Sequence, residues 1–185
     1  MLDIDLTFSQ ESIDNAIHQI EAYRDSIEKK NAEFISKLAS LGISVAQNST
    51  ASPEYASYVT FSKKIYASRE GRARGKVSGK SPQVLVEWEV NGEAWVSPIL
   101  MVEFGSGAKA SDASGKPNAQ KATELGYGRG TFPGQTHAFE ERWHWQDKKG
   151  RWHTSSGVEP DMPMWRAARE MRMEIARVAR QVFQS

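Results

Sequence analysis

The C-terminal stretch, residues 153–185, reads HTSSGVEPDMPMWRAAREMRMEIARVARQVFQS. Asp161 is the expected N-cap of a helix, and Pro163 falls in its first turn, where a missing N–H costs nothing. Apolar residues then recur at alternating steps of four and three, which places them on one stripe of a helix at 100° per residue. The stripe comprises Met164, Ala168, Met171, Ile175, Val178 and Val182, with Trp165 and Phe183 flanking it. The opposite side carries Arg166, Arg169, Arg177 and Arg180. The pattern predicts a helix that packs along one face.

A second long helix is predicted after Ser9, the expected N-cap, with Gly42 as its expected stop. Its apolar residues share one side: Ile13, Ile17, Ile20, Ile27, Phe34, Ile35, Leu38 and Leu41. Arg24 and Asn31 fall inside this stripe. The interruption fits a helix end or bend reaching past the core. It also fits a subunit contact in which a polar residue fixes the register.

Alternating apolar and polar residues predict strands at residues 2–8, 58–67 and 83–90. Asn91-Gly92 predicts a hairpin turn with a return strand through Trp95. We expect the C-terminal stripe to pack on the strand face that carries Val84, Val86 and Trp88. The predicted fold is therefore one α+β domain, residues 1–185, with an antiparallel sheet packed against the two long helices.

Another hairpin, rich in tryptophan, is predicted at residues 143–153. Two registers remain open, with Trp145 opposite either Trp152 or His153. Before it, residues 105–135 are rich in glycine and small polar side chains and lack apolar periodicity. They predict a long flexible loop, ordered on assembly if at all.

Composition excludes several classes of protein. The chain has 185 residues, a net charge of +1 and no cysteine. The cysteine count excludes disulfides, thiolate zinc sites and cysteine catalysis, and it fits a reducing cytoplasm. The N-terminal residues lack a signal-peptide pattern, and no apolar stretch approaches the roughly 20 residues that span a bilayer. We expect no membrane association.

One group of residues resembles a metal site: His137, Glu140, Glu141, His144 and His153. Their spacing matches no zinc signature, and the chain contains no nucleophile elbow or phosphate-binding loop. The expectation is no enzyme, with no catalytic residue, metal or cofactor. A metal-dependent hydrolase using His137, His144 and His153 stays as an alternative.

Residues 69–80 are basic and contain glycine at every fourth position. The cations are Arg69, Arg72, Arg74, Lys76 and Lys80. A solvated hairpin loop explains them, and so does a phosphate contact. A nucleic-acid-binding module formed by this loop and the tryptophan hairpin is a further alternative.

Three short segments follow one another in a recognisable order. They are LASLGI at the end of the first long helix (residues 38–43), VEFGSG (102–107) and PMWRAAREM (163–171). Their order resembles the minor virion proteins of long-tailed bacteriophages, which include tail components and neck, head–tail joining and tail-completion proteins. The glycine-rich loop and the tryptophan hairpin depart from the shorter members of that family.

The resemblance implies a structural protein of the head–tail connector, assembled in the host bacterial cytoplasm and located at the head–tail junction of the virion. It implies a homo-oligomeric ring, a hexamer, that adjoins head-completion (stopper), tail-terminator and tail-tube proteins. The expected interface residues are Arg24, Asn31, Trp143, Trp145, Trp152, Trp165 and Phe183. Genomic DNA passing through the ring would meet Arg69, Arg72, Arg74, Lys76 and Lys80.

Overall fold

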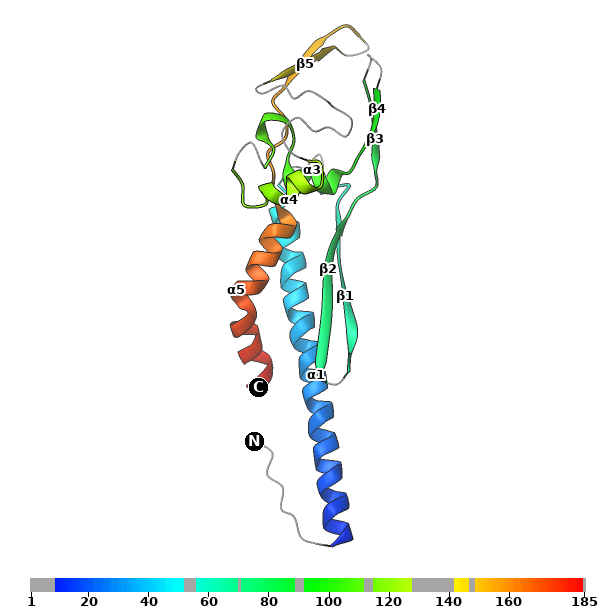
Figure 1. The fold of residues 1–185 in the computed structure, drawn as a ribbon, viewed down its shortest axis with the longest axis vertical. Coiled ribbons are helices and arrows are strands. Elements are labelled where there is room, and N and C mark those ends of the chain that lie inside the picture. The colour runs from blue at the N-terminus through cyan, green and yellow to red at the C-terminus, as the bar shows by residue number, and fades with distance from the viewer. Residues whose placement is uncertain are drawn as a thin grey trace.

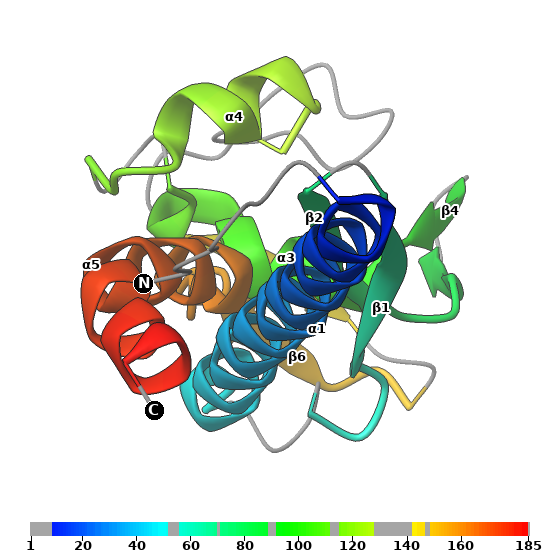
Figure 2. The ribbon, with the colours of Figure 1, turned by 90° about the horizontal axis from the view of Figure 1, so that it is seen from below.

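The computed structural model describes residues 9–51, 56–69, 71–88, 92–111, 115–127, 142–146 and 149–184. Its fold is α+β, as the sequence predicts, and the molecule is elongated (Figure 1). Helix α1 (Gln10–Ser49) runs along its length. Helix α5 (Pro163–Phe183) lies on one side of α1, and the hairpin of β1 (Thr60–Arg69) and β2 (Arg72–Lys80) lies on the other (Figure 2).

Helix α1 begins as predicted and ends later than predicted. The Ser9 hydroxyl oxygen accepts a hydrogen bond from the backbone N–H of Ser12 at 3.2 Å, which confirms the cap. The prediction that Gly42 ends the helix is wrong, because α1 continues to Ser49. A Cβ at position 42 would lie 2.7 Å from the sulfur of Met171 in α5. Gly42 therefore allows the two helices to approach closely.

Helix α5 packs along α1, and the predicted packing of its stripe on the face of Val84, Val86 and Trp88 is wrong. The rings of Phe34 and Phe183 lie 6.0 Å apart where the two helices meet near the C-terminus. The buried side chains of the helix pair include Leu38, Ala39, Ala46, Ala167, Val178 and Val182. Ala168 and Ile175, both assigned to the predicted core, are exposed.

Strand β2 occupies most of the basic segment at residues 69–80, for which the sequence predicts a loop. Alternate residues of β2 lie on the inner face of the hairpin, and two of these are glycines, Gly75 against α1 and Gly79 against α3 (Pro98–Phe104). A Cβ at Gly75 would lie 2.5 Å from Ile35, and one at Gly79 would lie 3.0 Å from Ile99. These glycines allow the strand to lie close to its neighbours, because a side chain at either position would clash.

The described strands form three separate antiparallel pairs instead of one sheet. Strands β3 (Val84–Trp88) and β4 (Gly92–Val96) pair with Trp88 opposite Gly92, so Gly92 belongs to the ladder and not to the predicted turn. Strands β5 (Trp143–Gln146) and β6 (Trp152–Ser155) pair with Trp145 opposite His153, which is the second of the two predicted registers. Both hairpins lie toward the end of the molecule opposite the N-terminal end of α1 (Figure 1).

Short helices occupy the region around the predicted flexible loop. Helix α3 (Pro98–Phe104) precedes it, and the described part of residues 105–135 contains a 3-10 turn, η1 (Gly107–Lys109), and helix α4 (Ala119–Glu124). This part buries Ala110, Ser111, Asn118 and Ala122. Residues 128–135, like the predicted strand at residues 2–8, lie outside the described residues.

Candidate functional site

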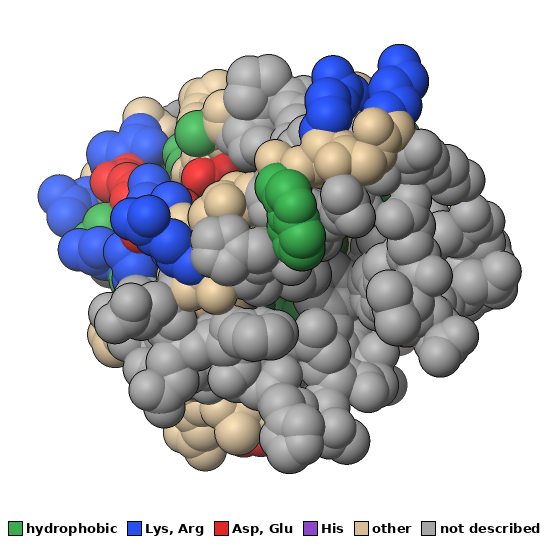
Figure 3. All heavy atoms as spheres, turned by 90° about the horizontal axis from the view of Figure 1, so that it is seen from above, with side chains coloured by type: hydrophobic (Ala, Val, Ile, Leu, Met, Phe, Trp, Pro, Cys, Tyr) green, Lys and Arg blue, Asp and Glu red, His purple; other side chains and the backbone are tan. Residues whose placement is uncertain are grey.

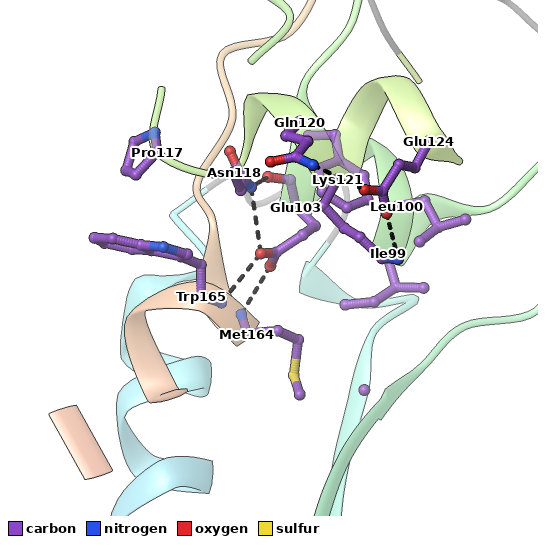
Figure 4. A pocket seen from close by; sticks show the side chains of 12 residues that line it. Ile99, Leu100, Glu103, Pro117, Asn118, Gln120, Lys121, Glu124, Met164 and Trp165 are labelled. Carbon is purple, nitrogen blue, oxygen red and sulfur yellow. Dashed lines mark hydrogen bonds and ion pairs between the residues drawn. The ribbon is translucent and has the colours of Figure 1, made fainter. Parts of the chain in front are cut away.

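Glu103 of α3 joins two distant parts of the chain. The residue is only 7% exposed, and its carboxylate accepts hydrogen bonds from the backbone N–H groups of Met164 at 2.8 Å and Trp165 at 3.1 Å (Figure 4). The amide of Asn118 donates to the backbone carbonyl of Glu103 at 2.8 Å. Met164 and Trp165 belong to the first turn of α5, so Glu103 caps this helix from another element.

The prediction that Asp161 caps α5 is wrong. Its carboxylate instead accepts a hydrogen bond at 3.0 Å from the backbone N–H of Ala51, just after α1. The residue before the helix is Met162, whose φ of 54° lies in the left-handed region. The backbone N–H groups of Asp161 and Met162 both donate to the carbonyl of Val102. This turn directs the start of α5 toward Glu103.

We call the contact between α3 and the start of α5 the joint. Further hydrogen bonds extend it along residues 102–107. The backbone N–H of Ser106 donates to the carbonyl of Val158 at 3.0 Å, and the backbone N–H of Val158 donates to the Ser106 hydroxyl at 3.1 Å. Gly105 has a φ of 71°, and a Cβ there would lie 2.6 Å from the Val158 carbonyl oxygen. The segments VEFGSG and PMWRAAREM, which carry the family resemblance, therefore meet in space.

The electrostatic state of Glu103 follows from two opposed effects. Burial raises the pKa of its carboxyl group above the ordinary value, because the charged form loses solvation. The hydrogen bonds from Met164, Trp165 and Asn118 favour the charged form and reduce that rise. The partial positive charge at the start of α5 also favours a carboxylate at this position.

An open pocket of about 640 Å³ lies beside the joint (Figure 4). Its walls are mainly apolar, and its rim carries Lys121 and Glu124, which form an ion pair at 2.8 Å. The lining residues include neither a histidine nor a hydroxyl or thiol nucleophile. The Glu103 carboxylate is already engaged in capping α5.

The predicted interface residues do not gather in one place. Asn31 donates from its side-chain amide to the backbone carbonyl of Gly71 at 3.2 Å, and Phe183 packs on Phe34, so both serve contacts within the chain. Arg24 is exposed and lies 3.3 Å from the carboxylate of Asp25.

The predicted tryptophans are also dispersed. Trp165 is half-buried at the pocket, and the guanidinium of Arg169 lies 5.6 Å from its ring centre. Trp143 and Trp145 lie on β5, and Trp152 lies on β6 and is 72% exposed. Strands β5 and β6 lie at the end of the molecule opposite the N-terminal end of α1, and Trp165 lies at the start of α5 (Figure 1). The tryptophans therefore form no single cluster with Arg24 or Asn31.

The N-terminal part of α1 extends beyond the rest of the described fold (Figure 1). Asn31 marks the level of the β1–β2 turn, and Phe34 marks the C-terminal end of α5. At 1.5 Å per residue, residues 10–30 continue for about 30 Å past these contacts. We call residues 10–30 the free end of α1.

Apolar side chains of the free end are exposed to solvent. Ile13, Ile17 and Ile20 are 41%, 48% and 52% exposed, and Tyr23 is 49% exposed. The isoleucines belong to the stripe predicted from sequence, whereas Tyr23 was missed because it lies beside the stripe. Ala16, which lies on the same face, is buried at 6% exposure, so the stripe is exposed in part, and its isoleucines are a candidate interaction surface.

Four of the five predicted DNA contacts, Arg72, Arg74, Lys76 and Lys80, lie on the outward face of the β1–β2 hairpin. Cross-strand pairs on this face are Thr60–Lys80, Ser62–Ser78, Lys64–Lys76 and Tyr66–Arg74. Arg72 continues the row on β2, and Arg69 is its partner in the ladder. Lys64 and Tyr66 were not predicted, although they alternate with inward residues on β1. We call Thr60, Ser62, Lys64, Tyr66, Arg72, Arg74, Lys76, Ser78 and Lys80 the donor face.

Every side chain of the donor face can donate a hydrogen bond. The ammonium of Lys64 lies 5.1 Å from the centre of the Tyr66 ring, and the guanidinium of Arg74 lies 5.6 Å from it. Lys64 and Lys76 are direct cross-strand partners, an arrangement of like charges that destabilises a sheet. An anionic ligand bound to this face would relieve the repulsion between Lys64 and Lys76.

The described residues contain no group of three histidine or carboxylate side chains placed to hold a metal ion. His137, Glu140 and Glu141 lie outside them. In the β5–β6 ladder His144 pairs with Thr154 and His153 pairs with Trp145, so the two histidines are not cross-strand partners. Within the same part of the chain, no helix is both long and apolar enough to cross a bilayer.

Comparison with protein-family models, with curated protein sequences and with solved structures returns no match to this chain.

Proposed function

We propose that this protein is a structural component of the head–tail connector of a long-tailed bacteriophage and acts by assembly, without catalysis. Copies of the chain form a ring, a hexamer, in the neck or at the tail end of the virion. The observation that carries this proposal is the exposed isoleucine stripe on the free end of α1. The joint at Glu103 supports it, because it unites the two segments on which the resemblance to phage virion proteins rests.

The exposed stripe has the spacing of an assembly surface. Ile13, Ile17 and Ile20 follow the alternating four-and-three steps of a helix seam, and Arg24 continues the same row. Full burial of an exposed isoleucine gains about 1.5–3 kcal/mol, and these three are already about half covered, so a partner that covers this row would gain about half of that for each. A polar residue within such a row fixes register at some cost in stability.

A phage carrying a lesion in this gene tests the proposal directly. Supplying the wild-type chain in trans should restore infectious particles, whereas Ile17→Asp should yield tailless heads and unattached tails. Gln19→Asp is the matched control, because Gln19 is exposed on another side of the same helix. Normal particles from a phage that lacks the gene would contradict the function.

A second candidate function is contact with the backbone of double-stranded DNA through the donor face. Its lysines and arginines would meet phosphates, and its hydroxyl groups would donate to phosphate oxygens. The net charge of the chain is only +1, but five of its cations lie on this one face, and counterion release depends on the local contacts. DNA passing through the proposed ring would be the ligand.

A further inference from the structure

A closed ring of identical chains needs two different, complementary patches on each copy. We infer that the free end of α1 of one copy docks on the outer face of α5 of the neighbouring copy. This inference rests on the proposed ring and names the surfaces that form it.

The first patch combines the isoleucine stripe with a row of carboxylates. Asp14, Glu21 and Glu28 recur every seven residues, and at 100° per residue they lie along one side of the stripe. Asp14 and Glu21 are exposed, and the carboxylate of Glu21 lies 3.7 Å from the imidazole of His18 on the same helix. We call Ile13, Asp14, Ile17, Ile20, Glu21 and Glu28 the acidic patch.

The second patch lies on α5, beside the row of residues that packs on α1. Ala168, Ile175 and Ala179 form a shallow apolar row, in which Ile175 is 48% exposed. Arg169, Arg172 and Arg180 line one side of this row and are exposed. Lysine and arginine side chains gather on the side of the molecule where α5 lies (Figure 3). We call these six residues the arginine patch.

The two patches match in shape and in charge. Each has an apolar row with a parallel row of charges along one side, and the charges are opposite. Alanine at two positions of the α5 row allows a second helix to approach closely, so that the isoleucines of α1 can pack around Ile175. Opposite charges beside such a seam select the partner and its register.

The two patches cannot meet within one chain. Phe183, near the end of α5, lies against Phe34, and the acidic patch begins beyond that level and continues away from α5. Contact between them therefore requires a second copy displaced along the axis of α1. Such a contact joins unlike patches and leaves one free patch on each of the two copies, so that further copies can add until the ring closes.

Charge reversal on each patch tests the contact. Glu21→Lys and Arg172→Glu are prepared as separate full-length proteins, and their masses are measured by light scattering after size-exclusion chromatography. Each variant alone should lose the wild-type oligomer and run at the chain mass of 20.7 kDa. An equimolar mixture should regain the oligomer, because the lysine introduced in one chain then meets the glutamate introduced in the other, and the wild-type pair forms at the next contact. Lys64→Glu, a reversal on the donor face, should keep the wild-type mass.

The outcomes separate this inference from the ring itself. If the wild type assembles and Arg172→Glu still assembles, or if the mixture stays at the mass of one chain, the α1–α5 contact is wrong while the ring stands. If Glu21→Lys alone disrupts assembly, the free ends of α1 pair with each other instead. If the wild type is monomeric at every concentration tested, both the ring and the contact fail. Circular dichroism confirms that each variant is folded.

Discussion

The carboxylate of Glu103 accepts a hydrogen bond from the backbone N–H of Trp165 at 3.1 Å, although the two residues lie on different helices and far apart in sequence. The second carboxylate oxygen takes the N–H of Met164. Through these bonds α3 fixes where α5 begins, and α5 in turn packs along α1. The position of the arginine patch relative to the free end of α1 is thus set by this cap together with the packing of α5 on α1.

Replacing Glu103 by alanine should destabilise the fold. Two backbone N–H groups of the first turn of α5 would lose their acceptor in a buried place, at a cost of about 1–3 kcal/mol. The measurement is chemical denaturation followed by circular dichroism. Glu33→Ala serves as the control, since Glu33 forms an exposed ion pair with Lys37, and should unfold at the wild-type midpoint. Equal midpoints for Glu103→Ala and wild type would exclude a capping role.

Stability should depend on pH through Glu103. Its pKa is raised in the folded state, so the unfolded chain ionises first as the pH rises. Its stabilising contribution is complete below the usual pKa of 4.5 and is lost as the pH rises through the folded pKa. The difference in unfolding free energy between wild type and Glu103→Gln should therefore fall over this window and then level. A difference that grows with pH would show a lowered pKa instead.

The close approach of α1 and α5 can be tested at Gly42. Gly42→Val places atoms where the Met171 side chain lies, and overpacking of this kind costs about 1–3 kcal/mol. Adding Met171→Ala should recover part of that loss, because the obstructing side chain is gone. Gln47→Val, at an exposed position of the same helix, controls for the lower helix propensity of valine. Additive effects of Gly42→Val and Met171→Ala would contradict the contact.

Local patterns predicted the elements better than they predicted the packing. The cap at Ser9, the two long helices and the strand pairs β3–β4 and β5–β6 follow from caps, hydrophobic periodicity and alternation. The stop at Gly42 and the cap at Asp161 failed for one reason. Each depends on a partner from elsewhere in the chain, Met171 in one case and Glu103 in the other. Periodicity also could not tell which side of the broad α5 stripe meets α1, so Ile175 was assigned to the core.

The candidate surfaces were only partly readable from sequence. Arg72, Arg74 and Lys76 recur every second residue, which is the period of a strand. This signal could have replaced the loop interpretation of residues 69–80. The exposure of the α1 stripe could not be foreseen, because an apolar stripe looks the same whether the chain itself or another copy covers it.

The donor face should bind double-stranded DNA in a salt-dependent way. Fluorescence anisotropy with a labelled duplex over a salt series gives the slope of log affinity against log salt. The double change Lys64→Gln and Lys76→Gln should weaken binding and reduce the slope by about 2, since each lost phosphate contact removes about 0.9. Lys29→Gln with Lys37→Gln removes the same charge from α1 and should leave the slope unchanged. Equal slopes for wild type and the donor-face variant would rule out this surface.

The mass of the purified wild-type chain in native mass spectrometry tests assembly most directly. The proposed ring predicts a closed oligomer of six copies of the 20.7 kDa chain, and Ile17→Asp should reduce it to single chains while its helical content is kept. A wild-type protein that remains a single chain at micromolar concentration, or an Ile17→Asp variant with the wild-type mass, would contradict assembly through the free end of α1.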